Sequence, residues 1–265
     1  MSGKRQFDGG TGIGARLDEL AVAVGFMSRL PVPFRDVPLS RAAWGFPLAG
    51  TLIGLISGLV LLSADALGLP SLASAVLALA AGALVTGALH EDGLADCADG
   101  FWGGTTPERR LEIMRDSRSG AFGVLALVLV CLFKAAILSD ILTRFGAPAA
   151  CAALMAVHTA ARGWLPAVMH FIPAAGKTGL AAMAGRPEAT VALAAVLLGL
   201  GGGAAVLSFT PPQAILALIL ASGLAVTAVA ALARRKLGGI NGDSLGGMEQ
   251  MAEAAGLAAL AAVGL

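Results

Sequence analysis

Six long apolar stretches constrain this chain more than any other feature of its sequence. They cover roughly residues 44–64, 70–89, 121–142, 149–170, 189–209 and 213–233, and a shorter apolar stretch covers about 251–265. Each of the six is long enough to cross about 30 Å of hydrocarbon as an α-helix. With 57% hydrophobic and only 13% charged residues, the chain lacks the polar side chains that cover a soluble protein. The sequence therefore predicts an integral membrane protein.

The positions of Lys and Arg predict how these helices are oriented. The residues before the first stretch contain several arginines and every second loop is cationic, whereas the loops between them contain only Arg144. Cytoplasmic loops carry the excess of Lys and Arg, so we expect a cytoplasmic N-terminus. Residues 90–118, 176–188 and 234–253, which hold most of the polar motifs, then lie on that same side. We predict an all-α polytopic membrane bundle of about six to seven transmembrane helices, with a site facing the cytoplasm.

Residues 1–265 are predicted to form a single membrane-embedded domain. Residues 1–42 would be a cytoplasmic leader with an interfacial helix, and residues 43–265 the transmembrane bundle. Within residues 15–30, four apolar residues recur at helical spacing among charged ones: Leu17, Leu20, Ala21 and Val24. This pattern is typical of an amphipathic helix lying in the membrane interface. Small residues in the spans, as at 199–203, would permit close helix packing in lipid.

Three aspartates after the second stretch are predicted to share one face of a helix. Asp92, Asp96 and Asp99 are spaced i, i+4 and i+7, which places their carboxylates in one narrow stripe. Two carboxylates about 6 Å apart repel by roughly 3 kcal/mol at an effective dielectric near 20. A divalent cation would offset that repulsion, and Mg²⁺ is typically held by one or two carboxylates plus substrate phosphates. The alternative is a solvated acidic helix face.

Glycines surround the aspartate stripe and are expected to let a bulky substrate approach the backbone. They are Gly93, Gly100, Gly103 and Gly104. Arginines follow in residues 108–118, where alternating charges also suit a solvated helix with internal ion pairs. Arg115 and Arg118 could instead bind phosphate oxygens, because a planar guanidinium recognises them bidentately. Lys177 could contact an anionic substrate, although its glycine-flanked segment lacks the spacing of a P-loop.

A glycine-rich turn leads into the final helix. Asp243 or Ser244 could cap that helix. Glu249 and Glu253 lie one turn apart where the helix enters an apolar stretch, and acidic residues there are costly and usually functional. We interpret these two as secondary ligands or bases.

Other ionisable residues lie within or beside apolar stretches. Lys134, His158 and Arg162 either pair within the bundle or line a cavity that admits a polar substrate. His90, beside the aspartate stripe, could be a base, a partner of the aspartates or an interfacial histidine. The net charge of +1 and the absence of a basic run with interleaved aromatics exclude a nucleic-acid partner. The three cysteines have no metal-like spacing and predict no disulfide framework.

Four segments together resemble the cobalamin synthase family. They are R-L-P-V-P at 29–33, H-E-D-G-L-A-D-C-A-D-G at 90–100, R-R-L-E-I-M-R-D-S-R at 109–118 and G-I-N-G-D-S-L-G at 239–246. The resemblance implies a Mg²⁺-dependent transferase of the bacterial or archaeal inner membrane. The implied reaction joins α-ribazole, or its 5′-phosphate, to adenosylcobinamide-GDP and releases GMP, which is the last step of nucleotide-loop assembly in cobalamin.

The resemblance also suggests roles for individual residues. Asp92, Asp96 and Asp99 would hold Mg²⁺ against the diphosphate while Arg115 and Arg118 neutralise developing charge. The base would be one of three acids, namely Asp99, Asp116 or Asp243. Further substrate contacts are expected from His90, Lys177, Asn241, Glu249 and Glu253. Asn241 stands where the family commonly has a threonine.

Other classes of membrane protein fit the sequence less well. A prenyltransferase usually has two aspartate-rich motifs, and the second is missing here. A CDP-alcohol phosphotransferase, also a Mg²⁺-dependent membrane diphosphate transferase, would need D-G-x-x-A-R, but Asp96 and Cys97 occupy the last two positions. A transporter could place charges in its spans, yet it would not need a carboxylate stripe in a loop. The expected partners are small-molecule substrates and the lipid bilayer, and a homo-oligomer remains open.

Overall fold

The computed structural model describes residues 12–176 and 179–265. Over these residues the chain is helical, contains no β-strand and has one isolated parallel bridge between Ala174 and Ile240. The predicted all-α class is therefore confirmed. The leader before residue 12 and Lys177 lie outside the described residues.

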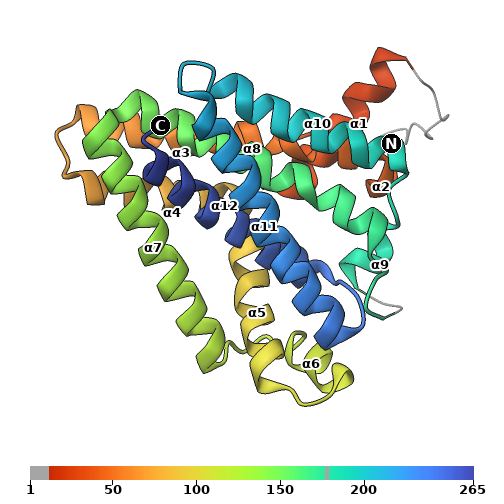
Figure 1. Ribbon diagram of the computed structural model, residues 1–265. Coiled ribbons are helices and arrows are strands. Elements are labelled where there is room, and N and C mark those ends of the chain that lie inside the picture. The colour runs from red at the N-terminus through yellow and green to blue at the C-terminus, as the bar shows by residue number, and fades with distance from the viewer. Residues whose placement is uncertain (1–11, 177–178) are drawn as a thin grey trace.

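Most of the predicted apolar stretches correspond to helices of similar extent (Figure 1). In chain order the helices are α1 (Ile13–Met27), α2 (Leu39–Ala42), the short 3-10 helix η1 (Ala43–Gly45), α3 (Phe46–Ala66), α4 (Ser71–Thr86), α5 (Leu89–Gly103), α6 (Pro107–Ile113), α7 (Ala121–Phe145), α8 (Ala147–Phe171), α9 (Leu180–Ala184), α10 (Ala189–Val206), α11 (Pro212–Leu237) and α12 (Gly242–Val263). The predicted short stretch at 251–265 is the second half of α12.

The number of helices suited to crossing a membrane is smaller than predicted. Among the described residues, four helical segments are long and apolar enough. They are Leu39–Ala66, which runs through α2, η1 and α3, and the helices α7, α10 and α11. The pair α4 and α5, bent by 91°, would make five. Helices α8 and α12 are long but carry buried charged residues, which lower their mean hydropathy. The predicted count of six to seven is thus not confirmed, although the membrane bundle is.

Helix α8 lies at the centre of the bundle and packs against α3, α10 and α12. Most of its residues are buried, whereas the most apolar windows of α7, α10 and α11 are only 22% buried. Glycines allow the close contacts of α8. A Cβ on Gly54 of α3 would lie 2.7 Å from Cα of Met155, and one on Gly163 would lie 2.7 Å from Cα of Gly199. The predicted packing role of the small residues is therefore confirmed.

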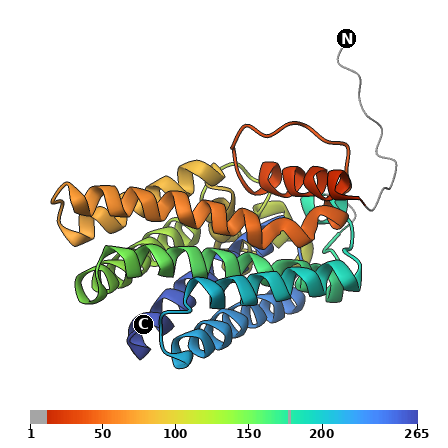
Figure 2. The ribbon, with the colours of Figure 1, turned by 90° about the horizontal axis from the view of Figure 1, so that it is seen from above.

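The connections of the bundle separate into two ends. The α3–α4, α7–α8 and α10–α11 connections gather at one end with the C-terminus, and α1, α9 and the α11–α12 connection lie at the other (Figure 2). At this second end Arg110 donates a hydrogen bond of 3.0 Å to the carbonyl of Lys236, and the N–H of Ala175 donates one of 2.6 Å to the carbonyl of Ile240. The polar segments predicted to share one side of the membrane do lie together.

The N-terminal helix α1 turns an unexpected face toward the bundle. Its buried residues are Glu19, Ala23 and Met27, while Leu17 of the predicted apolar stripe is 60% exposed. The Glu19 carboxylate is buried because Arg41 and the indole N–H of Trp44 bind it at 2.6 and 2.7 Å. The outward position of Leu17 suits an interfacial helix, which stays a prediction.

Candidate active site

The predicted aspartate stripe lies on helix α5, at the end of the bundle shared with α1 and α9. A sharp turn places it there, because Gly87 and Ala88 both adopt left-handed backbone conformations with φ of 68° and 58°. The three aspartates differ in exposure, since Asp92 is exposed, Asp96 is half-buried and Asp99 is only 7% exposed. The helix is as predicted, but its carboxylates do not share one environment.

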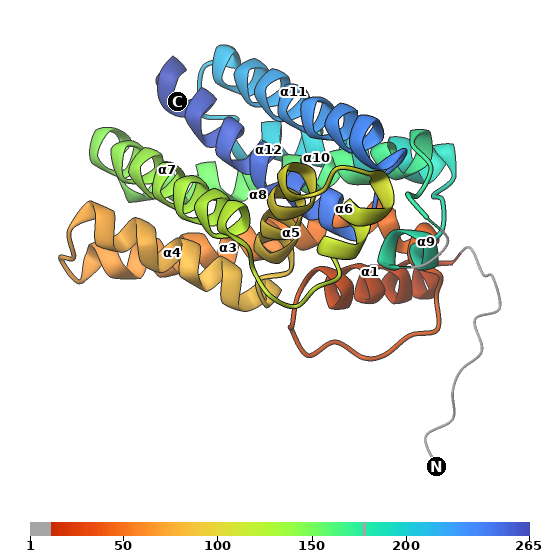
Figure 3. The ribbon, with the colours of Figure 1, turned by 90° about the horizontal axis from the view of Figure 1, so that it is seen from below.

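Helices α5 and α12 cross at a pair of glycines. A Cβ on Gly93 would lie 2.8 Å from the carbonyl oxygen of Asp243 and 3.1 Å from Cα of Gly246. The contact therefore brings the first turn of α12 against α5, although the two segments are far apart in the sequence. Figure 3 shows α5 and α12 at this end, with α6 beside them.

The expectation that the glycines near the stripe admit a substrate is wrong for most of them. Protein atoms fill the space next to Gly93, as described, and also next to Gly100 and Gly104. A Cβ at Gly100 would lie 2.7 Å from the Met114 side chain, and one at Gly104 would lie 2.9 Å from backbone atoms of Arg110. These glycines let α12 and α6 approach α5, which the spacing of glycines in the sequence does not reveal.

Asn241 caps helix α12, which corrects the prediction that Asp243 or Ser244 does so. The Asn241 side chain accepts a hydrogen bond of 2.9 Å from the Ser244 N–H, and the Asn241 N–H donates one of 2.9 Å to the Ser244 hydroxyl. This reciprocal arrangement is a capping box. The Asn241 amide also donates to the Asp243 carboxylate at 2.7 Å. Since threonine caps helices as asparagine does, the departure from the family's threonine keeps this cap.

Asp243 joins two aspartates of the stripe in what we call the acidic cluster, formed by Asp92, Asp96 and Asp243. Burial and the charge of Asp92 raise the pKa of Asp243 to about 6, against the opposing effects of the Asn241 hydrogen bond and the charge of Arg115. Asp96 is close enough to Asp243 and Asp92 to be influenced by both charges. Like charges gathered in this way are stabilised by a bound cation.

Asp99 is engaged differently from the other two aspartates. Its carboxylate accepts hydrogen bonds of 2.6 Å from the Gly120 N–H and 2.9 Å from the Gly123 N–H. These amides belong to the start of α7, where a carboxylate is favoured by unpaired N–H groups and the helix dipole. Asp99 thus fastens α5 to α7, and it is Asp243 that faces Asp92 and Asp96.

The segment after α6 contains Arg115, Asp116 and Arg118, all exposed. Arg118 binds Asp116 through two nitrogens at 3.1 and 2.8 Å, and these hydrogen bonds lower the pKa of Asp116 to about 2. A carboxylate with so low a pKa is a weak base. Arg115 is close enough to Asp243 to lower its pKa, so of the two predicted arginines it is the one associated with the acidic cluster.

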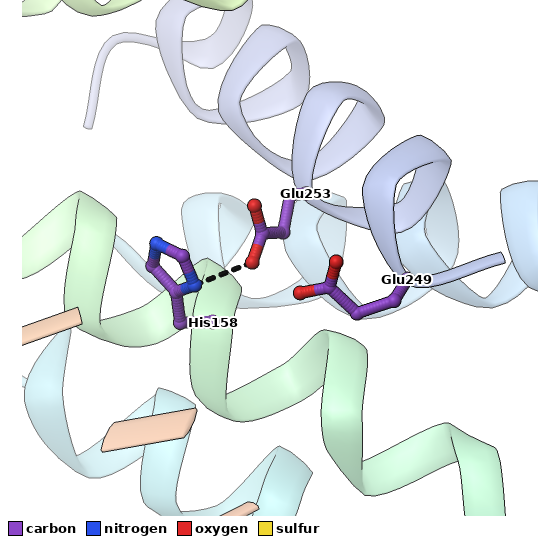
Figure 4. Close-up of side chains that lie close together, drawn as sticks. All are labelled: His158, Glu249 and Glu253. Atoms are coloured by element: carbon purple, nitrogen blue, oxygen red, sulfur yellow. Dashed lines mark ion pairs between the residues drawn. The ribbon is translucent and has the colours of Figure 1, made fainter. Parts of the chain in front are cut away.

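A buried ionic network lies deeper in the bundle, formed by Lys134, His158, Arg162, Glu249, Gln250 and Glu253. Glu253 binds His158, the Lys134 ammonium at 2.6 Å and the Arg162 guanidinium at 2.8 Å (Figure 4). Arg162 also contacts Glu249 at 2.5 Å. The interpretation that His158 and Arg162 pair within the bundle is confirmed. The two also line a cavity of about 350 Å³ beside α4 and α7.

The network includes three side chains with metal-ligand chemistry. Ligand atoms of His158, Glu249 and Glu253 lie within 4.8 Å of one another, and among residues 12–176 and 179–265 no other such group occurs. Lys134 and Arg162 already supply positive charge to these carboxylates, so no cation is needed. Glu249 and Glu253, predicted to contact substrate, are fully buried in ion pairs.

An apolar cavity of about 140 Å³ opens beside the acidic cluster. Its polar lining side chains are His90, Asp92 and Asp243, and its apolar walls include Phe26, Met27, Phe46, Leu165 and Met169. His90 is 3% exposed, and its Nδ1 has no hydrogen-bond partner among the residues described. No sequence pattern indicated this wall, because apolar residues of α1, α3 and α8 look the same whether they face lipid, core or substrate.

The fold and the site together define an integral membrane helical protein with an acidic cluster and an arginine at one end of its bundle. The chain belongs to the cobalamin-5-phosphate synthase family, whose model matches residues 19–261. It is 45% identical over 249 residues to an adenosylcobinamide-GDP ribazoletransferase of Brucella anthropi, covering 90% of this chain and 94% of that protein. A Brucella ovis protein with the same description is 44% identical over 248 residues, with the same coverage. No solved structure matches the chain.

Proposed function

We propose that this protein is an adenosylcobinamide-GDP ribazoletransferase that catalyses the last step of cobalamin assembly. The family and the relatives support this activity over nearly the whole chain. In the reaction, a ring hydroxyl of the ribose, which is free in both α-ribazole and its 5′-phosphate, attacks the phosphorus bonded to cobinamide, gives up its proton to a base, and displaces GMP. The observation that carries the assignment of the site is the meeting of Asp92, Asp96 and Asp243 beside Arg115.

The acidic cluster offers the oxygen donors that a magnesium ion binds, although ligand atoms of Asp92, Asp96 and Asp243 do not all lie within 4.8 Å of one another. Its donors are carboxylates, which are the oxygen ligands that Mg²⁺ prefers. The pKa of Asp243 is raised first by burial and second by the charge of Asp92, and a bound cation would offset both effects. Asp92, Asp96 and Asp243 would hold the ion, in place of the expected trio with Asp99. When bound, Mg²⁺ neutralises charge on the diphosphate oxygens.

The remaining chemistry belongs to this chain's own side chains. Asp243 is the best placed of the three candidate bases, because Asp99 accepts two amide hydrogen bonds and Asp116 is paired with Arg118. Its carboxylate accepts the proton of the attacking hydroxyl. Arg115 stabilises negative charge that develops on the transferred phosphoryl group. The Gly93–Gly246 crossing holds Asp243 against the stripe.

The site is proposed to face the cytoplasm in the inner membrane of a bacterium or archaeon. The cationic loops lie at the same end of the bundle as the acidic cluster, which supports this orientation by the positive-inside rule. Nucleotide-bearing substrates are then available to the site from the cytoplasm.

The test uses the full-length protein in detergent or lipid nanodiscs with adenosylcobinamide-GDP and α-ribazole. Chromatography should show GMP and adenosylcobalamin appearing in equal amounts with Mg²⁺, and neither with a chelator. A folded preparation that releases GMP without forming the joined product, or that forms it equally well in chelator, contradicts the proposal. Replacing α-ribazole by its 5′-phosphate in the same assay identifies the preferred acceptor.

A further inference from the structure

The apolar cavity described above opens directly onto the acidic cluster. Asp92 and Asp243 belong to both, so a ligand in the cavity has one end at the carboxylates. Apolar residues dominate the rest of the wall, and Phe46 and Leu165 are almost fully buried. Such a wall cannot replace the water lost by a phosphate or a charged group. The cavity is therefore suited to an uncharged, apolar part of a substrate.

The shape and volume of the cavity limit which apolar part of a substrate it can hold. The rings of Phe26 and Phe46 stack at a centroid separation of 5.8 Å with 14° between their planes, and both rings line the cavity. Met27 and Met169 add flexible, polarisable side chains that adapt to a flat ring. Its volume of about 140 Å³ is below the roughly 300–1,000 Å³ of pockets that enclose drug-sized ligands. It suits a single small ring system.

The two substrates of the proposed reaction differ in the parts they could place there. Adenosylcobinamide-GDP presents a large amide-bearing macrocycle, a charged diphosphate and a polar guanine. Ribazole is a nucleoside whose base is a flat, fused, apolar benzimidazole. Only the ribazole base matches a small apolar cavity with aromatic walls. The sugar attached to that base would then extend toward Asp243.

We propose that the apolar cavity binds the benzimidazole base of the ribazole substrate and thereby positions its sugar hydroxyl at Asp243. The inference rests on the proposed function and adds to it the acceptor subsite and its specificity-determining residues, Phe46 and Leu165. His90 supplies the polar contact to the base. Its side chain lines the cavity, and its buried Nδ1 has no hydrogen-bond partner among the described residues.

The test changes the size of the cavity and measures which base fits. Leu165→Phe narrows the wall and Phe46→Leu widens it. We expect Leu165→Phe to raise the KM for α-ribazole about tenfold, as small steric changes in apolar pockets do, and to leave the KM for adenosylcobinamide-GDP unchanged. Phe46→Leu should shift relative kcat/KM toward a riboside with the larger base naphthimidazole. The matched control is Leu193→Phe, because Leu193 lies on α10, 59% exposed and outside the cavity.

Thermal unfolding of each variant identifies any that fail to fold, and either resizing variant alone decides the outcome. An altered KM for adenosylcobinamide-GDP, or unchanged base preference in a folded variant, overturns the assignment of the cavity. Wild-type turnover in the same assay tests the proposed function separately. Binding of α-ribazole alone, followed by fluorescence of its base, reports on the cavity even without turnover, and loss of that binding in Leu165→Phe supports the assignment.

Discussion

The acidic cluster and the buried ionic network both draw carboxylates from α12, but they differ in how charge is compensated. In the network, Lys134 and Arg162 lie within 2.8 Å of the Glu253 carboxylate and all of the partners are buried. In the cluster, burial and the neighbouring charge of Asp92 raise the pKa of Asp243. A buried carboxylate whose charge is balanced by Lys or Arg side chains holds helices together. A group of carboxylates with excess negative charge is instead suited to binding a cation and its phosphate ligand.

The largest expected effect comes from a variant that tests the catalytic role of the acidic cluster. Asp243→Asn removes the negative charge and the proton acceptor but keeps the size and the polar contact with Asn241. We expect kcat to fall by roughly 10²–10⁴-fold, with little change in thermal unfolding, because the variant keeps the contact with Asn241 and removes a buried negative charge. The control is Asp140→Asn, which alters an exposed ion pair with Arg144 far from the cluster. Near-normal turnover in Asp243→Asn would remove Asp243 from the mechanism.

The stabilising role of the buried ionic network is tested by removing one of its cations. Arg162→Met leaves Glu249 and Glu253 with too little positive charge inside the bundle. Removing one partner of a buried pair costs roughly 3–5 kcal/mol, so unfolding in denaturant or heat should occur much earlier than in the wild type. The double variant Arg162→Met with Glu249→Met should recover much of that stability. If the single variant unfolds normally but loses only activity, the network has a role in the reaction instead.

A pH titration sharpens the comparison further. Because the pKa of Asp243 is raised to about 6, protons compete with a divalent cation at this carboxylate below that pH. Affinity for Mg²⁺, or for Mn²⁺ followed by its paramagnetic signal, should therefore weaken as the pH falls from 7 to 5. Asp243→Asn should change this pH dependence. Affinity that does not change over this range would place the cation elsewhere.

The smallest expected effect concerns the helix cap beside the cluster. Asn241→Ala removes the acceptor for the Ser244 N–H and should destabilise the protein by about 1 kcal/mol, whereas Asn241→Thr retains a capping oxygen and should cost less. Thermal unfolding of the two variants measures the difference. Equal loss in both would mean that the contact from the Asn241 amide to Asp243, rather than the cap, is what matters.

Local patterns in the sequence predicted the parts of this molecule that depend on local structure. The apolar stretches indicated the long helices, and the spacing of Asp92, Asp96 and Asp99 correctly placed them on one helix. What each aspartate contacts depends on other helices, and so the attachment of Asp99 to the start of α7 was not foreseen. The same holds for Gly93, whose partner Gly246 is distant in the sequence. Inside the bundle, the sequence left open whether His158 and Arg162 pair or line a cavity, and the tertiary contacts show that they do both.

The crossing of Gly93 and Gly246 also bears on how the protein is made. Asp92 and Asp96 leave the ribosome well before Asp243, which follows far later in the sequence. The carboxylates meet only when α12 has packed against α5 through that glycine contact. The nascent chain therefore keeps the carboxylates of the proposed cation site apart until α12 has packed against α5.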